Sequence, residues 1–184
     1  QIISGVSQGE NWNDYAVLYR MNAQSNQLEY AFKRNGIPYT VYGGTKFFDR
    51  TEVKDMLAYL CVVHNPADDL RLKRIINTPA RGIGARTVEL AESVAEQEGK
   101  PIYEVILHAA EYPQLVKQAA KLGKFTEIME SLREKAGTME LTDFYDEVVA
   151  ASGYITALEA KNTVENRSRI ENVQELKSSI QGYL

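Results

Sequence analysis

The residues best suited to chemistry form a short basic turn, Arg81-Gly82-Ile83-Gly84, with a second arginine at Arg86. Two glycines around one apolar residue allow a tight turn in which successive backbone N–H groups point outward. Ile83 can anchor this turn in a core. A helix that starts directly after the turn adds its own N–H groups and its positive dipole end at the same point. The pattern therefore predicts binding of a phosphate group without reading of bases.

Charge along the chain favours the same ligand, although a second interpretation stays open. From Arg71 to Arg86 the sequence contains five basic residues and no acidic one, in a chain whose net charge is −4. A basic face on an acidic body can bind phosphate while the body resists non-specific association. The alternative is a solvated helix face beside a glycine-containing connector, because a Gly-x-Gly pair alone is weak evidence.

Other kinds of site are not indicated. Gly99-Lys100 and Gly123-Lys124 are followed by Pro101 and Phe125 instead of the Ser or Thr of a nucleotide-binding loop. A single cysteine and two histidines, of which His108 is far in sequence from the other two residues, argue against a zinc site, a disulfide and a nucleophile–base pair. No run approaches the roughly 18 apolar residues of a membrane span. We therefore expect no catalytic residue, no metal, no cofactor bound by this chain alone, no membrane partner, and a cytoplasmic location.

The elements that position the turn divide near residue 65. Residues 15–19 form a short apolar run typical of a buried strand, residues 25–35 predict a helix, and residues 39–42 predict a second strand. A strand–helix–strand unit suggests a parallel pair in an α/β sheet, which two strands alone cannot complete. Beyond residue 44 the apolar residues recur at helical spacing. Helices are expected at 52–64, 68–76, 86–98 and 164–183, and from about 101, 113 and 141.

Three separated blocks carry a resemblance to the superfamily 1 DNA helicases of the UvrD/PcrA/Rep type. They are Ala-Val-Leu-Tyr-Arg-Met-Asn-Ala-Gln-Ser at 16–25, Tyr-Gly-Gly-Thr-Lys-Phe-Phe-Asp-Arg-Thr-Glu-Val-Lys-Asp at 42–55, and Asn-Thr-Pro-Ala-Arg-Gly-Ile-Gly at 77–84, with a weaker fourth at 168–176. In order and spacing these blocks are specific, and together they span nearly the whole chain.

The resemblance implies a fold in two parts. Residues 1–64 would be the first part of the second RecA-like motor domain, and residues 65–184 would be part of the helical accessory subdomain inserted into it. The fold class expected is therefore α/β plus all-α. A partial RecA-like parallel sheet segment would be followed by a helical accessory subdomain with a helix-hairpin-helix-like turn.

The resemblance also implies a function, that of a fragment of an ATP-dependent 3′–5′ DNA helicase. The intact enzyme would use ATP and Mg²⁺ held largely by residues absent from this chain, so the chain alone is expected to be inactive. Its partners would be DNA at a single-strand/duplex junction and proteins of repair or replication. In this family the first two blocks lie by the single-stranded DNA track and the motor interface, where they couple the subdomains, and the Gly-Ile-Gly block contacts duplex ahead of the fork. The DNA-binding residues implied are Arg20, Asn22, Gln24, Ser25, Phe47, Arg50, Lys54, Thr78, Arg81, Gly82, Ile83, Gly84, Arg86 and Thr87.

Several of these residues also have structural interpretations. Arg20 suits a surface salt bridge, and the polar side chains at 22–25 suit a helix cap. Phe47 and Phe48 could stack on bases, but we expect at least one of them to be buried at a hinge. Relatives often carry arginine where this chain has Asn26, which puts any ionic contact of that arginine in doubt.

The charged residues Arg50 and Lys54 stand near a helix start, where ion pairs between subdomains are as plausible as contacts to DNA. The alternative function is that of a helical protein-interaction module without a DNA role, in which the basic turn is incidental.

Overall fold

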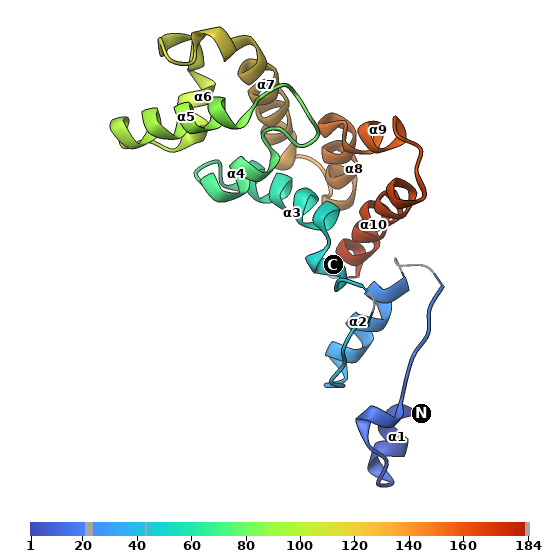
Figure 1. Cartoon of the computed structure of the whole chain (residues 1–184). Coiled ribbons are helices and arrows are strands. Elements are labelled where there is room, and N and C mark those ends of the chain that lie inside the picture. Colours follow the sequence, from blue (N-terminus) through green and yellow to red (C-terminus); the bar gives the residue numbers. More distant parts are fainter. Residues whose placement is uncertain (21–23, 43, 183–184) are drawn as a thin grey trace.

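The computed structural model describes residues 1–20, 24–42 and 44–182, and every regular element within these ranges is a helix (Figure 1). Short 3₁₀ turns separate the longer elements at η1 (Trp12–Asp14), η2 (Phe47–Asp49), η3 (Ala109–Glu111) and η4 (Val116–Gln118). The α-helices are α1 (Ile2–Ser7), α2 (Gln24–Arg34), α3 (Thr51–His64), α4 (Asp69–Ile75), α5 (Ala85–Glu98), α6 (Ile102–Leu107), α7 (Ala119–Ala136), α8 (Leu141–Ser152), α9 (Tyr154–Glu159) and α10 (Val164–Gln181).

The predicted partial sheet is wrong. Residues 15–19 and 39–42 form no strand, and the described ranges contain no β-ladder. Neither segment has a buried face: Leu18 is 94% and Tyr42 90% exposed, and none of the residues in the two segments is fully buried. A strand is stable only where a neighbouring backbone takes up its N–H and C=O groups and one face is buried. These two segments do not pair with each other, so β-forming residue types alone leave them as extended connectors.

The segment predicted as a helix-hairpin-helix-like turn connects α4 and α5. Helix α4 packs mainly against α3 and α5 against α6, while Lys73 of α4 and Glu92 of α5 form an ion pair at 2.6 Å. Residues 76–84 separate the two helices, and Ile83 in this connection is inserted into the core at 1% exposure. The helix expected from residue 113 is displaced as well, because turns and η4 precede α7, which starts at Ala119.

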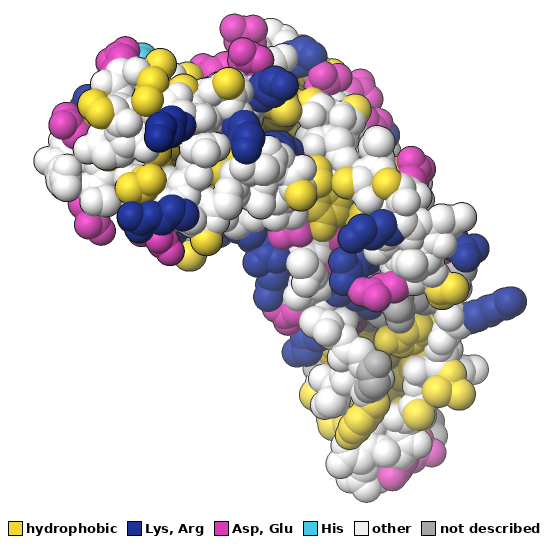
Figure 2. All heavy atoms as spheres, turned by 45° about the horizontal axis from the view of Figure 1, so that its top comes forward, with side chains coloured by type: hydrophobic (Ala, Val, Ile, Leu, Met, Phe, Trp, Pro, Cys, Tyr) yellow, Lys and Arg dark blue, Asp and Glu magenta, His cyan; other side chains and the backbone are white. Residues whose placement is uncertain are grey.

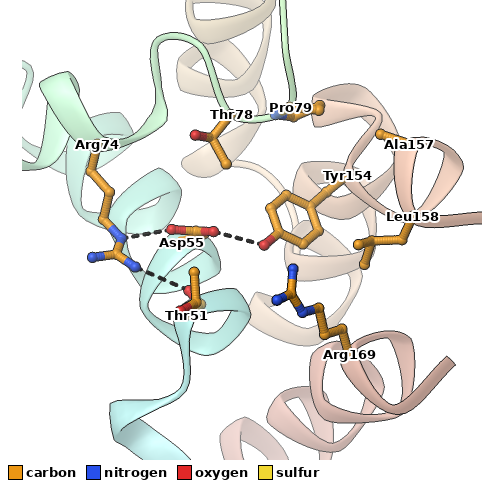
Figure 3. Close-up of a pocket in the computed structure, with 9 residues that line it drawn as sticks. All are labelled: Thr51, Asp55, Arg74, Thr78, Pro79, Tyr154, Ala157, Leu158 and Arg169. Atoms are coloured by element: carbon orange, nitrogen blue, oxygen red, sulfur yellow. Dashed lines mark hydrogen bonds and ion pairs between the residues drawn. The ribbon is translucent and has the colours of Figure 1, made fainter. Parts of the chain in front are cut away.

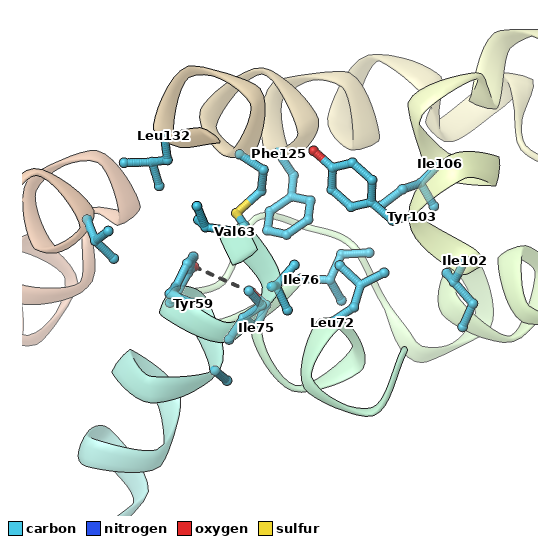
Figure 4. Packing of buried hydrophobic residues seen from close by; sticks show 14 of the residues in the cluster. Tyr59, Val63, Leu72, Ile75, Ile76, Ile102, Tyr103, Ile106, Phe125 and Leu132 are labelled. Carbon is cyan, nitrogen blue, oxygen red and sulfur yellow. Dashed lines mark hydrogen bonds between the residues drawn. The ribbon is translucent and has the colours of Figure 1, made fainter. Parts of the chain in front are cut away.

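Helix α3 is the centre of the helical body. It contacts α4, α7, α8 and α10, and its buried residues lie on more than one face. A helix that buries most of its circumference belongs to the interior of a fold. Figure 4 shows Tyr59 and Val63 of α3 facing Phe125 of α7 and Ile75 of α4 across the core. The last helix, α10, returns to the beginning of α3 and also contacts α8 and α9.

Local signals fix where individual helices begin and end. The side chain of Asp68 caps α4 by accepting from Arg71 N at 3.0 Å, and Thr163 caps α10 by accepting from Asn166 N at 3.1 Å. Gly153 ends α8 with a φ of 70°, a left-handed conformation that lets α9 start at once in a new direction.

The N-terminal part is extended away from this body. Helix α1 and η1 bury no residue, and Figure 1 shows them at the far end of the molecule from α5 and α7. Helix α2 lies between them and the body. None of the helices in the described ranges is both long enough and apolar enough to cross a membrane.

Substitutions at two leucines of α4 test the packing of the hydrophobic core. Leu72 is fully buried and Leu70 is 78% exposed. We expect Leu72→Ala to lower the free energy of unfolding by about 2–5 kcal/mol, because it leaves a cavity. Leu70→Ala should change it by less than about 0.5 kcal/mol. Urea denaturation followed by circular dichroism measures both, and equal effects of the two substitutions would contradict this packing.

Candidate nucleic-acid interface

The α4–α5 loop, residues 76–84, is closed by one asparagine side chain. Asn77 Oδ1 accepts from the backbone N of Arg81 at 2.7 Å and from that of Ile83 at 3.1 Å. Gly82, between them, has a φ of 72°, in the left-handed region that glycine adopts without a steric penalty. Ile83 is buried, as the sequence predicted. The turn therefore has a fixed shape.

Helix α5 begins immediately after this turn and carries no cap. Gly84 is its N-cap residue, with extended backbone and no side-chain hydrogen bond. In the part of the chain that the structure describes, the backbone N–H groups of Ala85 and Arg86 donate to no acceptor. Gly82, Gly84 and Ala85 put no bulk in front of these donors. An anion can reach them, which is the arrangement that favours phosphate at helix N-termini.

A lysine from another part of the chain lies beside the turn. Lys121, on α7, is exposed and donates from Nζ to Gly82 O at 3.2 Å. A Cβ added at Gly82 would lie 3.3 Å from the same Nζ, so the two residues are in close contact. Sequence reasoning missed Lys121, because no local pattern links it to a loop so far away in the chain.

The five basic residues between positions 71 and 86 do not form one basic face. Three of them pair with carboxylates from outside the stretch: Arg71 with Asp68, Lys73 with Glu92 at 2.6 Å, and Arg74 with Asp55 at 2.6 Å. Arg86 remains at the surface, with a side chain 81% exposed and only a 3.5 Å contact to Glu89. Figure 2 shows basic side chains spread over one face of the body, with acidic ones mostly at its margin.

The side chain of Arg81 points into the body instead of toward solvent. Nη1 donates to the carbonyls of Ile75 and Pro79 at 3.2 and 3.0 Å. Nη2 donates to Tyr59 Oη at 2.7 Å and to Ser152 O at 2.9 Å. The guanidinium also lies 5.5 Å from the ring centre of Phe125. Of the remaining predicted contacts in this region, Thr87 is buried and Thr78 is half-buried.

The predicted contacts of the second block are partly inside the protein. Arg50 donates to Ser25 Oγ at 2.7 Å and to Asn172 Oδ1 at 2.6 Å, while Asn172 donates to Glu52 Oε1 at 2.5 Å. Burial lowers the pKa of Arg50, an effect that the neighbouring carboxylates, Glu52 among them, oppose. This cluster joins α2, α3 and α10.

Asn26, where relatives often carry arginine, has an internal role in this chain. Its side-chain nitrogen donates to Glu175 Oε1 at 3.0 Å and to Ser179 Oγ at 2.6 Å. Phe47 is fully buried and its backbone N donates to Glu29, which confirms that at least one of the two phenylalanines is buried. Contacts of this kind attach α2 and η2 to the helical body.

The exposed candidates lie nearer the N-terminal end. Arg20 is exposed, and its backbone N donates to Gln24 Oε1 at 3.1 Å. Lys54 pairs with Asp49 at 2.9 Å and is 44% exposed; the hydrogen bond lowers the pKa of the Asp49 carboxyl. Asn22 lies outside the described residues. These side chains are available for contact but do not form one compact cluster with the α4–α5 loop.

A pocket of about 430 Å³ lies behind the α4–α5 loop, between α3, α9 and α10 (Figure 3). Its buried acid, Asp55, accepts from Arg74 Nε at 2.6 Å and from Tyr154 Oη at 2.7 Å. Burial, and then this hydrogen bond, raise the pKa of Tyr154. Arg169 faces the same space and pairs with Glu165 at 2.5 Å. The charges lining the pocket are thus already balanced within the protein.

The two Gly-Lys pairs of the sequence do not lie in nucleotide-binding loops. Gly123-Lys124 lies inside α7, and Gly99-Lys100 lies at the end of α5, where Lys100 pairs with Glu104 at 3.3 Å. Neither pair can form a phosphate-binding loop in these positions. Across residues 1–20, 24–42 and 44–182, no group of three or more His, Cys, Asp or Glu side chains is arranged to hold a metal ion.

Backbone N–H groups at helix N-termini and basic side chains are among the groups that contact phosphate in protein–DNA complexes. The comparisons place the chain in a family of DNA helicases. Over residues 1–184 the sequence matches the family described as UvrD-like helicase C-terminal domain, and the chain belongs to this family.

Among the relatives, the chain is 39% identical over 183 residues to the ATP-dependent DNA helicase PcrA of Staphylococcus aureus strain Mu50. It is 37% identical over 183 residues to the protein of the same name from Staphylococcus epidermidis strain RP62A. Each alignment covers 100% of this chain and 25% of the relative. The chain therefore spans about a quarter of the length of these curated relatives, and the resemblance expected from the sequence blocks is confirmed.

Asn172 tests the cluster that joins α2, α3 and α10. It is 3% exposed and has contacts to Arg50 and Glu52. We expect Asn172→Ala to lower the free energy of unfolding by about 1–3 kcal/mol, because both charged partners lose a hydrogen bond. Asn162→Ala, at an exposed turn, is the control and should change it by less than about 0.5 kcal/mol. A loss no larger than the control's in chemical denaturation would show that the cluster contributes nothing.

Proposed function

We propose that this chain is part of an ATP-dependent DNA helicase and that the α4–α5 loop, with the start of α5, binds the phosphate backbone of duplex DNA near a fork. The observation that carries this proposal is the uncapped start of α5. The N–H groups of Ala85 and Arg86 have no acceptor in the described part of the chain, and the space beside the preceding Gly84 is open, since a Cβ added there would meet nothing within 4 Å. Membership of the helicase family supplies DNA as the source of the phosphate.

The charges around this point support a contact of modest strength. Arg86 and Lys121 are exposed; Arg86 carries one of the uncapped donors, and Lys121 lies beside Gly82 of the same turn. Backbone amides and two cations can bind a phosphate without reading the base sequence. Such sequence-independent binding suits a helicase that must move along any DNA. Most other cations of the loop region are paired within the protein, so binding by this chain alone should be weak.

A second contact is proposed for the N-terminal part. Arg20, Gln24 and Lys54 are exposed, and with Asn22 they would reach single-stranded DNA. Ser25, Phe47 and Arg50 would act from inside by holding α2 and η2 in place.

The rest of the helicase cycle is assigned to the intact protein. ATP and Mg²⁺ would be bound largely by parts of the intact protein outside this chain, because neither Gly-Lys pair of the chain is followed by the Ser or Thr of a nucleotide-binding loop. Unwinding with 3′–5′ polarity, and partners from repair or replication, belong to the same proposal. Within it, this chain contributes DNA contacts and the attachment of the helical body, and by itself hydrolyses no ATP.

Salt-dependent binding tests the duplex contact. We expect the chain to bind a forked DNA duplex weakly in fluorescence anisotropy, with an affinity that falls as salt is raised. Arg86→Ala and Lys121→Ala should each reduce the slope of log affinity against log salt by roughly one, because each removes one cation from phosphate.

Lys100→Ala is the matched control at the opposite end of α5, and it should leave the slope unchanged. Absence of binding at low salt, or a slope that neither substitution alters, would contradict the proposal. That result would favour the alternative of a protein-interaction module.

A further inference from the structure

We infer that Arg81 is a positioning residue, which holds the phosphate-binding turn from inside the protein and does not itself contact DNA. This inference rests on the proposed function. The backbone donors of α5, together with Arg86 and Lys121, would recognise the phosphate. Arg81, in the loop, would therefore have a different role from Arg86, which is exposed in the first turn of α5.

The hydrogen-bonding capacity of the Arg81 side chain is nearly used up. Both protons of Nη1 are taken by the carbonyls of Ile75 and Pro79, and both protons of Nη2 by Tyr59 Oη and Ser152 O. Only the Nε proton remains for a further acceptor. A bidentate contact to phosphate would require this side chain to give up two internal bonds. Leaving these carbonyls without a donor costs free energy, so the internal hydrogen bonds of Arg81 are favoured over a contact to phosphate.

The acceptors come from three separate parts of the fold. Ile75 is the last residue of α4, Pro79 lies within the loop, and Ser152 is the last residue of α8. The planar guanidinium of Arg81 therefore connects the C-terminal ends of α4 and α8 to the α4–α5 loop. The backbone N of Arg81 is fixed as well, by Asn77 Oδ1 at 2.7 Å. Because Gly82 and the N–H groups at the start of α5 come directly after Arg81 in the chain, fixing Arg81 also fixes their position.

Tyr59 connects the same group to the central helix. Its hydroxyl accepts from Arg81 Nη2 at 2.7 Å and donates to Thr78 O at 2.6 Å, so it touches the loop on two sides. Burial raises the pKa of Tyr59 to about 12, and the hydroxyl therefore keeps the proton that it donates. Tyr59 has no exposed surface, which means that no DNA can contact it.

Two conservative substitutions distinguish a positioning role from a phosphate contact. Tyr59→Phe removes one hydroxyl that DNA cannot reach. Arg81→Lys keeps the positive charge, but a single ammonium group cannot satisfy three carbonyls and a hydroxyl at the corners of a planar fork. If Arg81 were a phosphate ligand, Arg81→Lys would keep one ionic contact to phosphate, and Tyr59→Phe would have no effect on binding.

We expect both substitutions to weaken binding of the forked duplex by about 3- to 10-fold while the salt slope stays that of the unmodified chain. Tyr145→Phe is the matched control: it removes an equally buried hydroxyl, which donates to Val173 O at 2.7 Å on α10, and should leave affinity unchanged. Melting curves of each variant confirm that it is folded. Unchanged affinity in both Tyr59→Phe and Arg81→Lys would overturn the inference.

Hydrogen exchange without DNA separates this inference from the proposed function. In Tyr59→Phe and Arg81→Lys, the amide proton of Ile83, bound to Asn77 Oδ1 at 3.1 Å, should exchange at least several-fold faster than in the unmodified chain. Unchanged exchange would overturn the inference even if the chain binds DNA. Faster exchange in a chain that binds no forked DNA at any salt would refute the proposed function, and with it any role of Arg81 in phosphate binding.

Discussion

The helical body depends on how α3 satisfies the polar groups that it buries. Glu52, Asp55 and Tyr59 are each at most 5% exposed, and their spacing places them along one side of the helix. A buried polar group without a partner costs about 1–3 kcal/mol, so each of them requires one. The partners come from different elements. Glu52 accepts from Asn172 of α10, and Asp55 accepts from Arg74 of α4 and Tyr154 of α9. Tyr59 donates to Thr78 O in the α4–α5 loop. Apolar burial supplies most of the stabilisation, and these bonds select one docking position for each element.

The same requirement explains the character of the candidate interface. Arg74 and Arg81 are drawn inward to satisfy groups on and around α3, and they are lost to the surface. What remains outside is the backbone at the start of α5, with Arg86 and Lys121 beside it. A surface of this kind offers donors in fixed positions but little net charge. It can hold a phosphate in place without binding nucleic acid so tightly that movement along it would stop.

Much of the helical part could be predicted from the sequence, because helical periodicity and capping residues are local signals. The buried Ile83 and the helix start after it were predicted for the same reason. The strands at 15–19 and 39–42 were wrong, since residue type favours an extended backbone but cannot supply a pairing partner. The roles of Arg81 and Lys121 depend on residues far away in the chain. Glu92 and Asp55, each 19 residues away from its partner, also neutralise Lys73 and Arg74 of the basic stretch, and no charge count within that stretch predicts this.

The central claim is that phosphate is held by backbone donors at the start of α5, in a turn fixed from inside. Chemical-shift mapping of the ¹⁵N-labelled chain during titration with a forked duplex tests it most directly. We predict that the largest shifts fall on the amides of Gly82, Gly84, Ala85 and Arg86, while the Arg81 Nε resonance stays in place. The opposite pattern, with the Arg81 side chain shifted and these amides unmoved, would contradict the account.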